Sequence, residues 1–133
     1  MPLYRCTTPP GSLDDEQRSA IAVAITDIHC GATGAPPTFV HVQFFDGLDG
    51  GDSVTLHGGL RSGRDDGVVV EIIERCIATV SEVSGVAADR ITMRTSGTPA
   101  HWIFEGGRVM PEPGQEAAWL AAGGAGVGAT GAG

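Results

Sequence analysis

The sequence lacks lysine. All eight of its basic residues are arginine, and sixteen Asp and Glu residues give it a net charge of −8. Proteins that bind duplex DNA or an anionic membrane usually carry the opposite balance, so no nucleic acid or membrane partner is expected. No apolar run approaches the ~20 residues that cross a bilayer. Because the amino terminus also has no basic and apolar secretory pattern, we expect a cytoplasmic protein.

Cysteine is scarce as well. The three cysteines, Cys6, Cys30 and Cys76, lie far apart in the sequence and form no C-x-x-C pair. Their odd number does not suit a secreted disulfide framework. The four histidines share no metal-ligand spacing with one another or with the cysteines. We therefore expect buried or half-buried thiols, no bound metal and no cofactor.

Two similar halves make up most of the 133 residues. Each half predicts a strand, a helix and a strand, at 2–8, 12–34 and 38–45, and then at 53–60, 62–85 and 90–96. Ser12 or Asp14 can cap the first helix, and Ser62 with Asp65 is a start signal for the second. The second helix has the clearest periodicity, with apolar residues at Val69, Ile72, Ile73, Cys76, Val80 and Val83.

Two such units predict an α+β fold, in which one four-stranded sheet carries both helices on one face. The other face would be uncovered and apolar in a monomer, which implies further copies of the chain. A small hairpin is expected around Glu105-Gly106-Gly107. We predict a single domain over residues 1–119 and a flexible tail of mostly Ala and Gly over residues 120–133.

Pro2 is the first candidate for chemistry. The initiator methionine is normally removed before a small residue, and the mature chain would then begin with a secondary amine. An α-amino group has a pKa of about 7.7–8.0, which burial or nearby cations lower. Such an amine can act as a general base and its conjugate as a general acid. The alternative is that this is one of many Met-Pro starts without a function.

Arg61 and Arg64 are the second candidates. They lie where the third strand ends and the second helix begins, and a helix amino terminus favours anions. Two guanidinium groups there could bind a carboxylate in bidentate fashion. The alternative is that they pair with Asp65 and Asp66 on the surface.

His29 is the third candidate, near the carboxyl end of the first helix. It could donate a hydrogen bond to a carbonyl or carboxylate of a substrate. The alternative is a structural histidine that the helix dipole stabilises.

Together these residues resemble the tautomerase superfamily. The similarity rests on Pro2, the doubled β-α-β pattern, A-I-T-D-I-H at 24–29 and L-R-S-G-R at 60–64, and it extends through G-R-V-M-P-E-P-G-Q-E-A-A-W at 107–119. Within the superfamily, the chain is most similar to the cis-3-chloroacrylic acid dehalogenase group. The resemblance implies a homotrimer, a catalytic Pro2, carboxylate-binding Arg61 and Arg64, and a His29 that contacts substrate.

The sequence departs from the dehalogenase pattern in its C-terminal segment. The resemblance implies a tyrosine and a glutamate that position and activate water, but Gly106 and Ala117 stand at those positions. Glu116 and Glu112 lie close by and are the possible water-activating residues.

Keto–enol tautomerisation needs no activated water. The function expected is therefore a tautomerase acting on 2-hydroxy-alkenoate or 2-keto acids such as phenylenolpyruvate. Pro2 would move the proton, Arg61 and Arg64 would hold the carboxylate, and His29 would position the oxygen. The alternatives are a cis-3-haloacrylate dehalogenase or hydratase and, from another class, a non-catalytic trimeric protein that binds small-molecule carboxylates.

Overall fold

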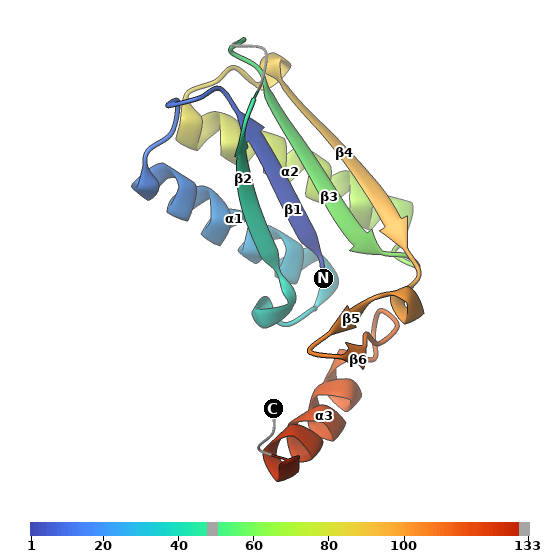
Figure 1. The fold of residues 1–133 in the computed structure, drawn as a ribbon. Helices are drawn as coiled ribbons and strands as arrows, with labels where there is room; N and C mark the ends of the chain where they lie inside the picture. The colour runs from blue at the N-terminus through green and yellow to red at the C-terminus, as the bar shows by residue number, and fades with distance from the viewer. Residues whose placement is uncertain (48–50, 131–133) are drawn as a thin grey trace.

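A four-stranded mixed sheet forms the centre of the molecule (Figure 1). The structure is a computed structural model that describes the backbone of residues 1–47 and 51–130 and the side chains up to residue 123. The sheet order is β2-β1-β3-β4, with β1 at Leu3–Thr8, β2 at His41–Asp46, β3 at Val54–Arg61 and β4 at Ile91–Thr98. Strand β1 runs parallel to β2 and antiparallel to β3, and β3 runs parallel to β4.

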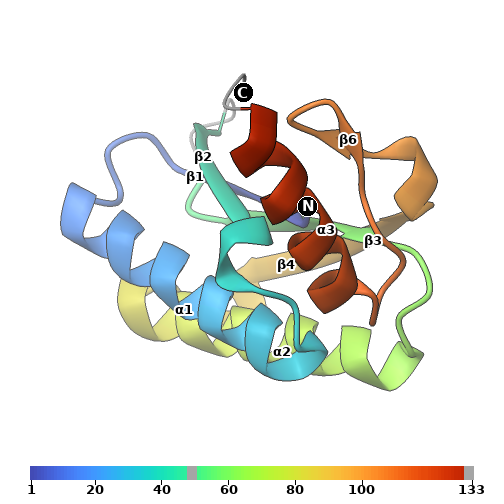
Figure 2. The ribbon, with the colours of Figure 1, turned by 90° about the horizontal axis from the view of Figure 1, so that it is seen from below.

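Two long helices cover one face of this sheet, which confirms the predicted fold (Figures 1 and 2). Helix α1 spans Asp15–Thr33 and helix α2 spans Asp66–Ser84. The side chain of Asp14 accepts a hydrogen bond from the Gln17 backbone N–H, and the Gln17 side-chain oxygen accepts one from the Asp14 backbone N–H, so α1 begins with a capping box. Gly34 and Gly85 end the two helices in the left-handed conformation, at φ values of 75° and 77°.

The predicted start of the second helix at Ser62 is wrong. Its N-cap is Asp65, and no side chain caps it by a hydrogen bond. The backbone N–H of Ser62 donates to the carbonyl of Thr98 at 2.8 Å, so Ser62 continues the pairing of β3 with β4. The second predicted strand, at 38–45, begins later than expected, because Pro37–Phe39 form a 3-10 turn, η1, and β2 starts at His41.

The hydrophobic core lies between the helices and the covered face. The buried members of the stripe on α2 are Ile72, Cys76 and Val80, and α1 contributes Ile21, Ile25 and Ile28. From the sheet, Tyr4 and Cys6 on β1 and Leu56 on β3 point into the same cluster. Burial of this apolar surface is what fixes the two helices on the sheet.

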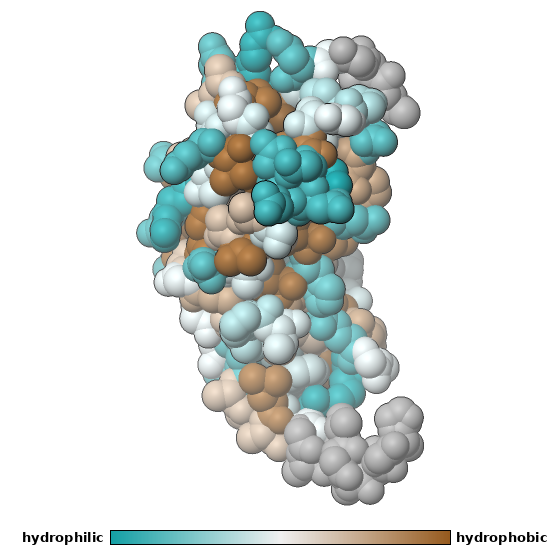
Figure 3. Space-filling view, turned by 90° about the vertical axis from the view of Figure 1, so that its left-hand side faces the viewer, coloured by the Kyte–Doolittle hydropathy of each residue, from teal (hydrophilic) through white to brown (hydrophobic). Residues whose placement is uncertain are grey.

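The open face of the sheet is more polar than predicted. A hollow of about 870 Å³ over β1 and β2 is lined by Leu3, Arg5, Thr7, Gln43, Phe45, Asp46 and Gly47. Only two of these are large apolar side chains, since the apolar residues of β1 and β2 that alternate with them face the core. Apolar and polar patches are also interspersed on the side of the molecule shown in Figure 3.

The C-terminal segment leaves the sheet after η3 (Ala100–Trp102) and forms the predicted hairpin of β5 (Phe104–Glu105) and β6 (Arg108–Val109). Gly106 and Gly107 turn the chain at φ values of 59° and 79°. Helix α3 (Glu116–Thr130) follows and lies beyond the hairpin, away from the sheet (Figure 1). The segment from 120 is thus helical as far as Thr130, and its flexibility and the domain boundary at 119 remain predictions.

Within the described ranges 1–47 and 51–130, no helix combines the length and apolar character that crossing a membrane requires.

Candidate active site

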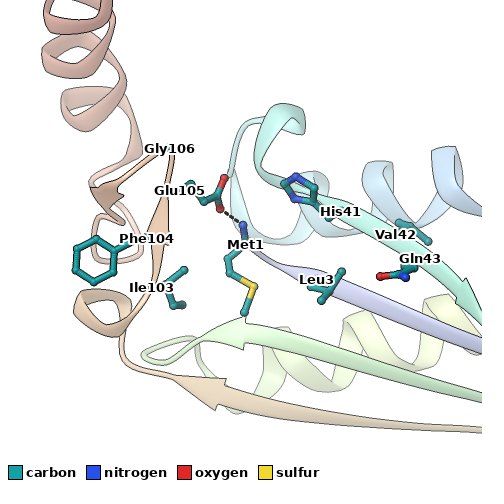
Figure 4. Close-up of a pocket in the computed structure, with 9 residues that line it drawn as sticks. All are labelled: Met1, Leu3, His41, Val42, Gln43, Ile103, Phe104, Glu105 and Gly106. Carbon is teal, nitrogen blue, oxygen red and sulfur yellow. Dashed lines mark hydrogen bonds and ion pairs between the residues drawn. The ribbon is translucent and has the colours of Figure 1, made fainter. Parts of the chain in front are cut away.

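The amino terminus lies at the end of β1 that faces the C-terminal hairpin. Pro2 is fully buried, and its carbonyl accepts a hydrogen bond from the His41 backbone N–H at 3.0 Å. The structure includes Met1, whose terminal amine forms an ion pair with Glu105 (Figure 4). A hollow of about 670 Å³ lies here, lined by Met1, Leu3, His41, Val42, Gln43, Ile103, Phe104, Glu105 and Gly106.

Glu105 is a site residue that the sequence reasoning missed. The predicted hairpin placed it beside a turn, but nothing in the sequence indicated that the turn reaches the terminus 104 positions away. In the structure its carboxylate is the counter-ion of the Met1 terminal amine.

His29 lies in the last turns of α1 and is buried, with 2% of its surface exposed. Its Nδ1 lies 2.8 Å from the hydroxyl of Tyr4 on β1. Its Nε2 is buried and has no hydrogen-bond partner among the described residues. Burial, together with the positive charges of Arg64 and Arg61, lowers the pKa of His29 to about 4, so the ring is neutral at pH 7.

Arg61 lies at the end of β3 and is 3% exposed. One of its terminal nitrogens donates to the Pro111 carbonyl at 2.6 Å, and the other donates to Glu116 Oε2 at 2.7 Å. Its guanidinium lies 5.4 Å from the centre of the Phe39 ring. Two N–H donors of Arg61 therefore hold the C-terminal segment against the end of the sheet.

Arg64 is held more loosely. It donates to Glu116 Oε2 at 3.3 Å and to the Thr33 carbonyl at 3.4 Å, both long distances for such bonds. It also lines two hollows, of about 230 and 270 Å³, on either side of the loop before α2. Neither arginine pairs with Asp65 or Asp66 in the structure, which was the surface alternative.

Glu116 joins the two arginines. Burial raises the pKa of its carboxyl, but the hydrogen bond and charge of Arg61 and the bond from the Gly114 N–H outweigh burial and hold that pKa below its usual range. Glu116 is therefore ionised and is 7% exposed. The other candidate, Glu112, is exposed and makes no side-chain hydrogen bond, and Gly106 and Ala117 are exposed as well.

The structure thus gathers the sequence candidates at one end of the sheet. The charges that act on His29 are those of Arg64, Arg61, the terminal amine and Glu116. Arg64 also reaches the carboxyl end of α1 through Thr33. The arrangement combines an amine, a neutral imidazole and guanidinium groups, which can move a proton on an anionic substrate while holding its carboxylate. Among the described residues, no group of three His, Cys, Asp or Glu side chains is placed to hold a metal ion.

Comparison with protein families finds a match over the first two-thirds of the chain. A family model described as "Putative oxalocrotonate tautomerase enzyme" matches residues 1–85. The chain belongs to this tautomerase family. The match includes Pro2, His29 and both arginines of the site, whereas Glu105 and Glu116 lie beyond it. No curated protein matches the sequence.

Solved structures resemble more of this chain than the family model covers. One is N1, a member of the cis-3-chloroacrylic acid dehalogenase family, with 28% identity over 90% of this chain and 91% of that chain and a TM-score of 0.84. Ps01740 has 31% identity over 78% of this chain and 100% of that chain, with a TM-score of 0.72. A fused 4-OT described as an asymmetric trimer has 19% identity over 81% of this chain and 95% of that chain, with a TM-score of 0.72, and shares the fold.

Proposed function

We propose that this chain is a keto–enol tautomerase that acts on a 2-hydroxy-alkenoate or 2-keto acid of the phenylenolpyruvate kind. The observation that carries the proposal is that His29 and Arg64 lie at the end of the sheet where β1 begins. His29 contacts Tyr4 on β1, and Arg64 follows the end of β3 and contacts Thr33 at the end of α1. Removal of Met1, which lines the hollow beside Glu105 (Figure 4), would leave the free amine on Pro2, directly before β1.

The reaction requires one proton to move between two atoms of the substrate. The Pro2 amine takes the proton of the enol hydroxyl, the oxygen becomes the 2-keto group, and the protonated amine returns the proton to C3. No atom is gained or lost, and the amine is regenerated. The reverse direction uses the same two steps.

The two arginines have different roles in substrate binding. The hydrogen bonds of Arg64 are longer and weaker than those of Arg61, so Arg64 is the guanidinium that would bind the substrate carboxylate. Arg61 is engaged by Pro111 and Glu116 and contributes its charge and the placement of Glu116. His29 offers Nε2 to a substrate oxygen, because that atom has no partner among the described residues.

Hydration or dehalogenation of a cis-3-haloacrylate is the second candidate function. It is favoured by Glu116, a buried and ionised carboxylate beside the two arginines. In this reaction water adds to the substrate, and halide and a proton leave. Both Glu116 oxygens already accept hydrogen bonds from Arg61, Arg64 or Gly114, which weakens Glu116 as a base toward water.

A homotrimer is part of the proposal. It is supported by the uncovered sheet face with its hollow over β1 and β2 and by the trimeric description of the fused 4-OT that shares this fold. Sedimentation of the purified chain should give three times the monomer mass, and a stable monomer would contradict it.

Parallel assays on one purified sample separate the candidates. Phenylenolpyruvate ketonisation is followed by absorbance, halide release from cis-3-chloroacrylate with a halide electrode, and carboxylate binding by calorimetry. Ketonisation much faster than halide release supports the tautomerase. Halide release at an equal or greater rate favours the dehalogenase, and binding without turnover of either substrate indicates the non-catalytic carboxylate-binding protein.

A further inference from the structure

A buried contact joins Tyr4 on β1 to His29 on α1. The Tyr4 hydroxyl lies 2.8 Å from His29 Nδ1, and the rings meet edge to face with centroids 5.7 Å apart. Tyr4 is 1% exposed and His29 is 2% exposed. A hydrogen bond in such surroundings holds a side chain far more firmly than one in water does.

The direction of this hydrogen bond follows from counting partners. Burial raises the pKa of the Tyr4 phenol, so the hydroxyl keeps its proton, and the neutral ring of His29 carries one N–H. If Tyr4 donates, only the Nε2–H of His29 is left without a partner. If His29 donates instead, both the hydroxyl hydrogen and Nε2 are left without one among the described residues. The first arrangement leaves fewer buried polar groups unpaired.

We propose that Tyr4 is a positioning residue that fixes His29 as the neutral Nε2–H tautomer. The ring then presents a single uncharged donor beside Arg64, Arg61, the terminal amine and Glu116, which are the charged groups that act on it. A substrate oxygen would accept a hydrogen bond from Nε2–H, and the ring could not turn without breaking the bond to Tyr4. Only this kinetic consequence rests on the proposed function, because the tautomer belongs to the unliganded chain.

The matching substrate chemistry is that of an anionic oxygen acceptor. A 2-keto or enolate oxygen accepts a hydrogen bond but does not donate one, and a neutral imidazole can stabilise its developing charge without being a competing acid. The tautomer therefore selects for an oxygen next to the carboxylate that Arg64 would hold.

Proton–nitrogen correlation NMR on the full-length chain tests the tautomer directly at pH 7. The expected spectrum has His29 with Nδ1 unprotonated and Nε2 protonated, and the signal is assigned by its loss in His29→Gln. An Nδ1–H tautomer, or a charged ring at pH 7, would overturn the proposal.

Tyr4→Phe tests the role of the hydroxyl. It should turn the His29 signals toward a mixture of tautomers and lower kcat/KM for phenylenolpyruvate by about tenfold. Ile25→Val, a buried change one turn before His29, is the matched control and should leave the tautomer unchanged. Unchanged His29 signals in Tyr4→Phe would contradict the role of Tyr4.

A second measurement covers the case in which Tyr4→Phe fails to fold. Tyr4 is the only tyrosine, so 3-fluorotyrosine labels this position alone and keeps both ring and hydroxyl. Fluorine makes the phenol a stronger donor, so the Nδ1 signal should move further and Nε2 should stay protonated. A fixed Nδ1 signal would overturn Tyr4 as the donor. If the tautomer is as proposed but no enol substrate turns over, the proposed function fails and this inference stands.

Discussion

Arg61 and Glu116 form a buried ion pair between the end of β3 and the start of α3, with 2.7 Å between Arg61 Nη2 and Glu116 Oε2. The side chains are 1% and 9% exposed. The pair connects the second β-α-β unit to the C-terminal segment that completes the site. Because a charge left alone in such a place is costly, the ion pair ties the stability of the fold to the shape of the site.

Glu116→Ala should therefore destabilise the chain strongly. Removing one partner of a buried pair costs about 3–5 kcal/mol, because the other charge stays buried. Chemical denaturation followed by circular dichroism measures the loss. Glu112→Ala, four positions earlier and exposed, is the control and should change the free energy of unfolding by less than about 0.5 kcal/mol. Equal effects of the two substitutions would show that the ion pair does not hold the segment.

Arg64→Gln should mainly affect substrate binding. Loss of a charge-assisted contact to the carboxylate should raise KM for phenylenolpyruvate by about ten- to a hundredfold, with only a small fall in stability. Arg61→Gln should instead lower the free energy of unfolding, because it removes the bonds to Pro111 and Glu116. Steady-state kinetics and denaturation on both variants give the comparison. A mainly raised KM in Arg61→Gln, together with a mainly lowered stability in Arg64→Gln, would contradict the roles proposed for the two arginines.

His29 should make stability depend on pH. Its folded pKa is about 4 and its unfolded pKa is about 6.5, so the unfolded chain binds more protons between these values. Stability from this group is present above pH 6.5 and is lost as pH falls toward 4, by about 3 kcal/mol in total. Denaturation midpoints from pH 7.5 to 4 measure the slope. In His29→Gln this part of the slope should vanish, and an unchanged slope would show that His29 is not buried in its neutral form.

The absence of a side chain at Gly58 on β3 should be necessary for the observed position of the Tyr4 ring. The two residues are partners across β1 and β3, and a Cβ at position 58 would lie 2.9 Å from Cε1 of Tyr4. Gly58→Ala should therefore displace the Tyr4 ring and disturb its hydrogen bond to His29. We expect it to lower kcat/KM for phenylenolpyruvate about as much as Tyr4→Phe does. Gly67→Ala, on α2 where a Cβ meets nothing within 4 Å, should leave the activity unchanged. Full activity of Gly58→Ala would mean that the Tyr4 ring has room to adjust.

Most of the fold could be predicted from local patterns. The periodicity on α2 and the stop signals at Gly34 and Gly85 set the helices, and alternation with turn residues set the strands. The start of α2 was wrong because Ser62 is drawn into the pairing of β3 with β4, a contact between distant segments. The polar open face was also missed, since the prediction rested on apolar residues that turn toward the core.

The site could be predicted only in part. Pro2, His29, Arg61 and Arg64 carry recognisable patterns in the sequence, and their roles stay predictions. The contacts of Tyr4 and Glu105 depend on pairing across the molecule, which a single sequence does not encode locally. The sequence indicated Glu116 as a possible water-activating residue. Its ion pair with Arg61 was not predicted, because it forms only when the C-terminal segment folds back on the sheet.

The free amine of Pro2 is the central claim, and one paired experiment on purified protein tests it most directly. Intact mass establishes whether Met1 is absent, and phenylenolpyruvate ketonisation is then measured on wild type, Pro2→Ala and the control Pro10→Ala in an exposed turn. The account predicts loss of Met1, rapid ketonisation by wild type and Pro10→Ala, and at least about a hundredfold less by Pro2→Ala. A fully active Pro2→Ala enzyme, or equal activity with Met1 retained, would contradict it.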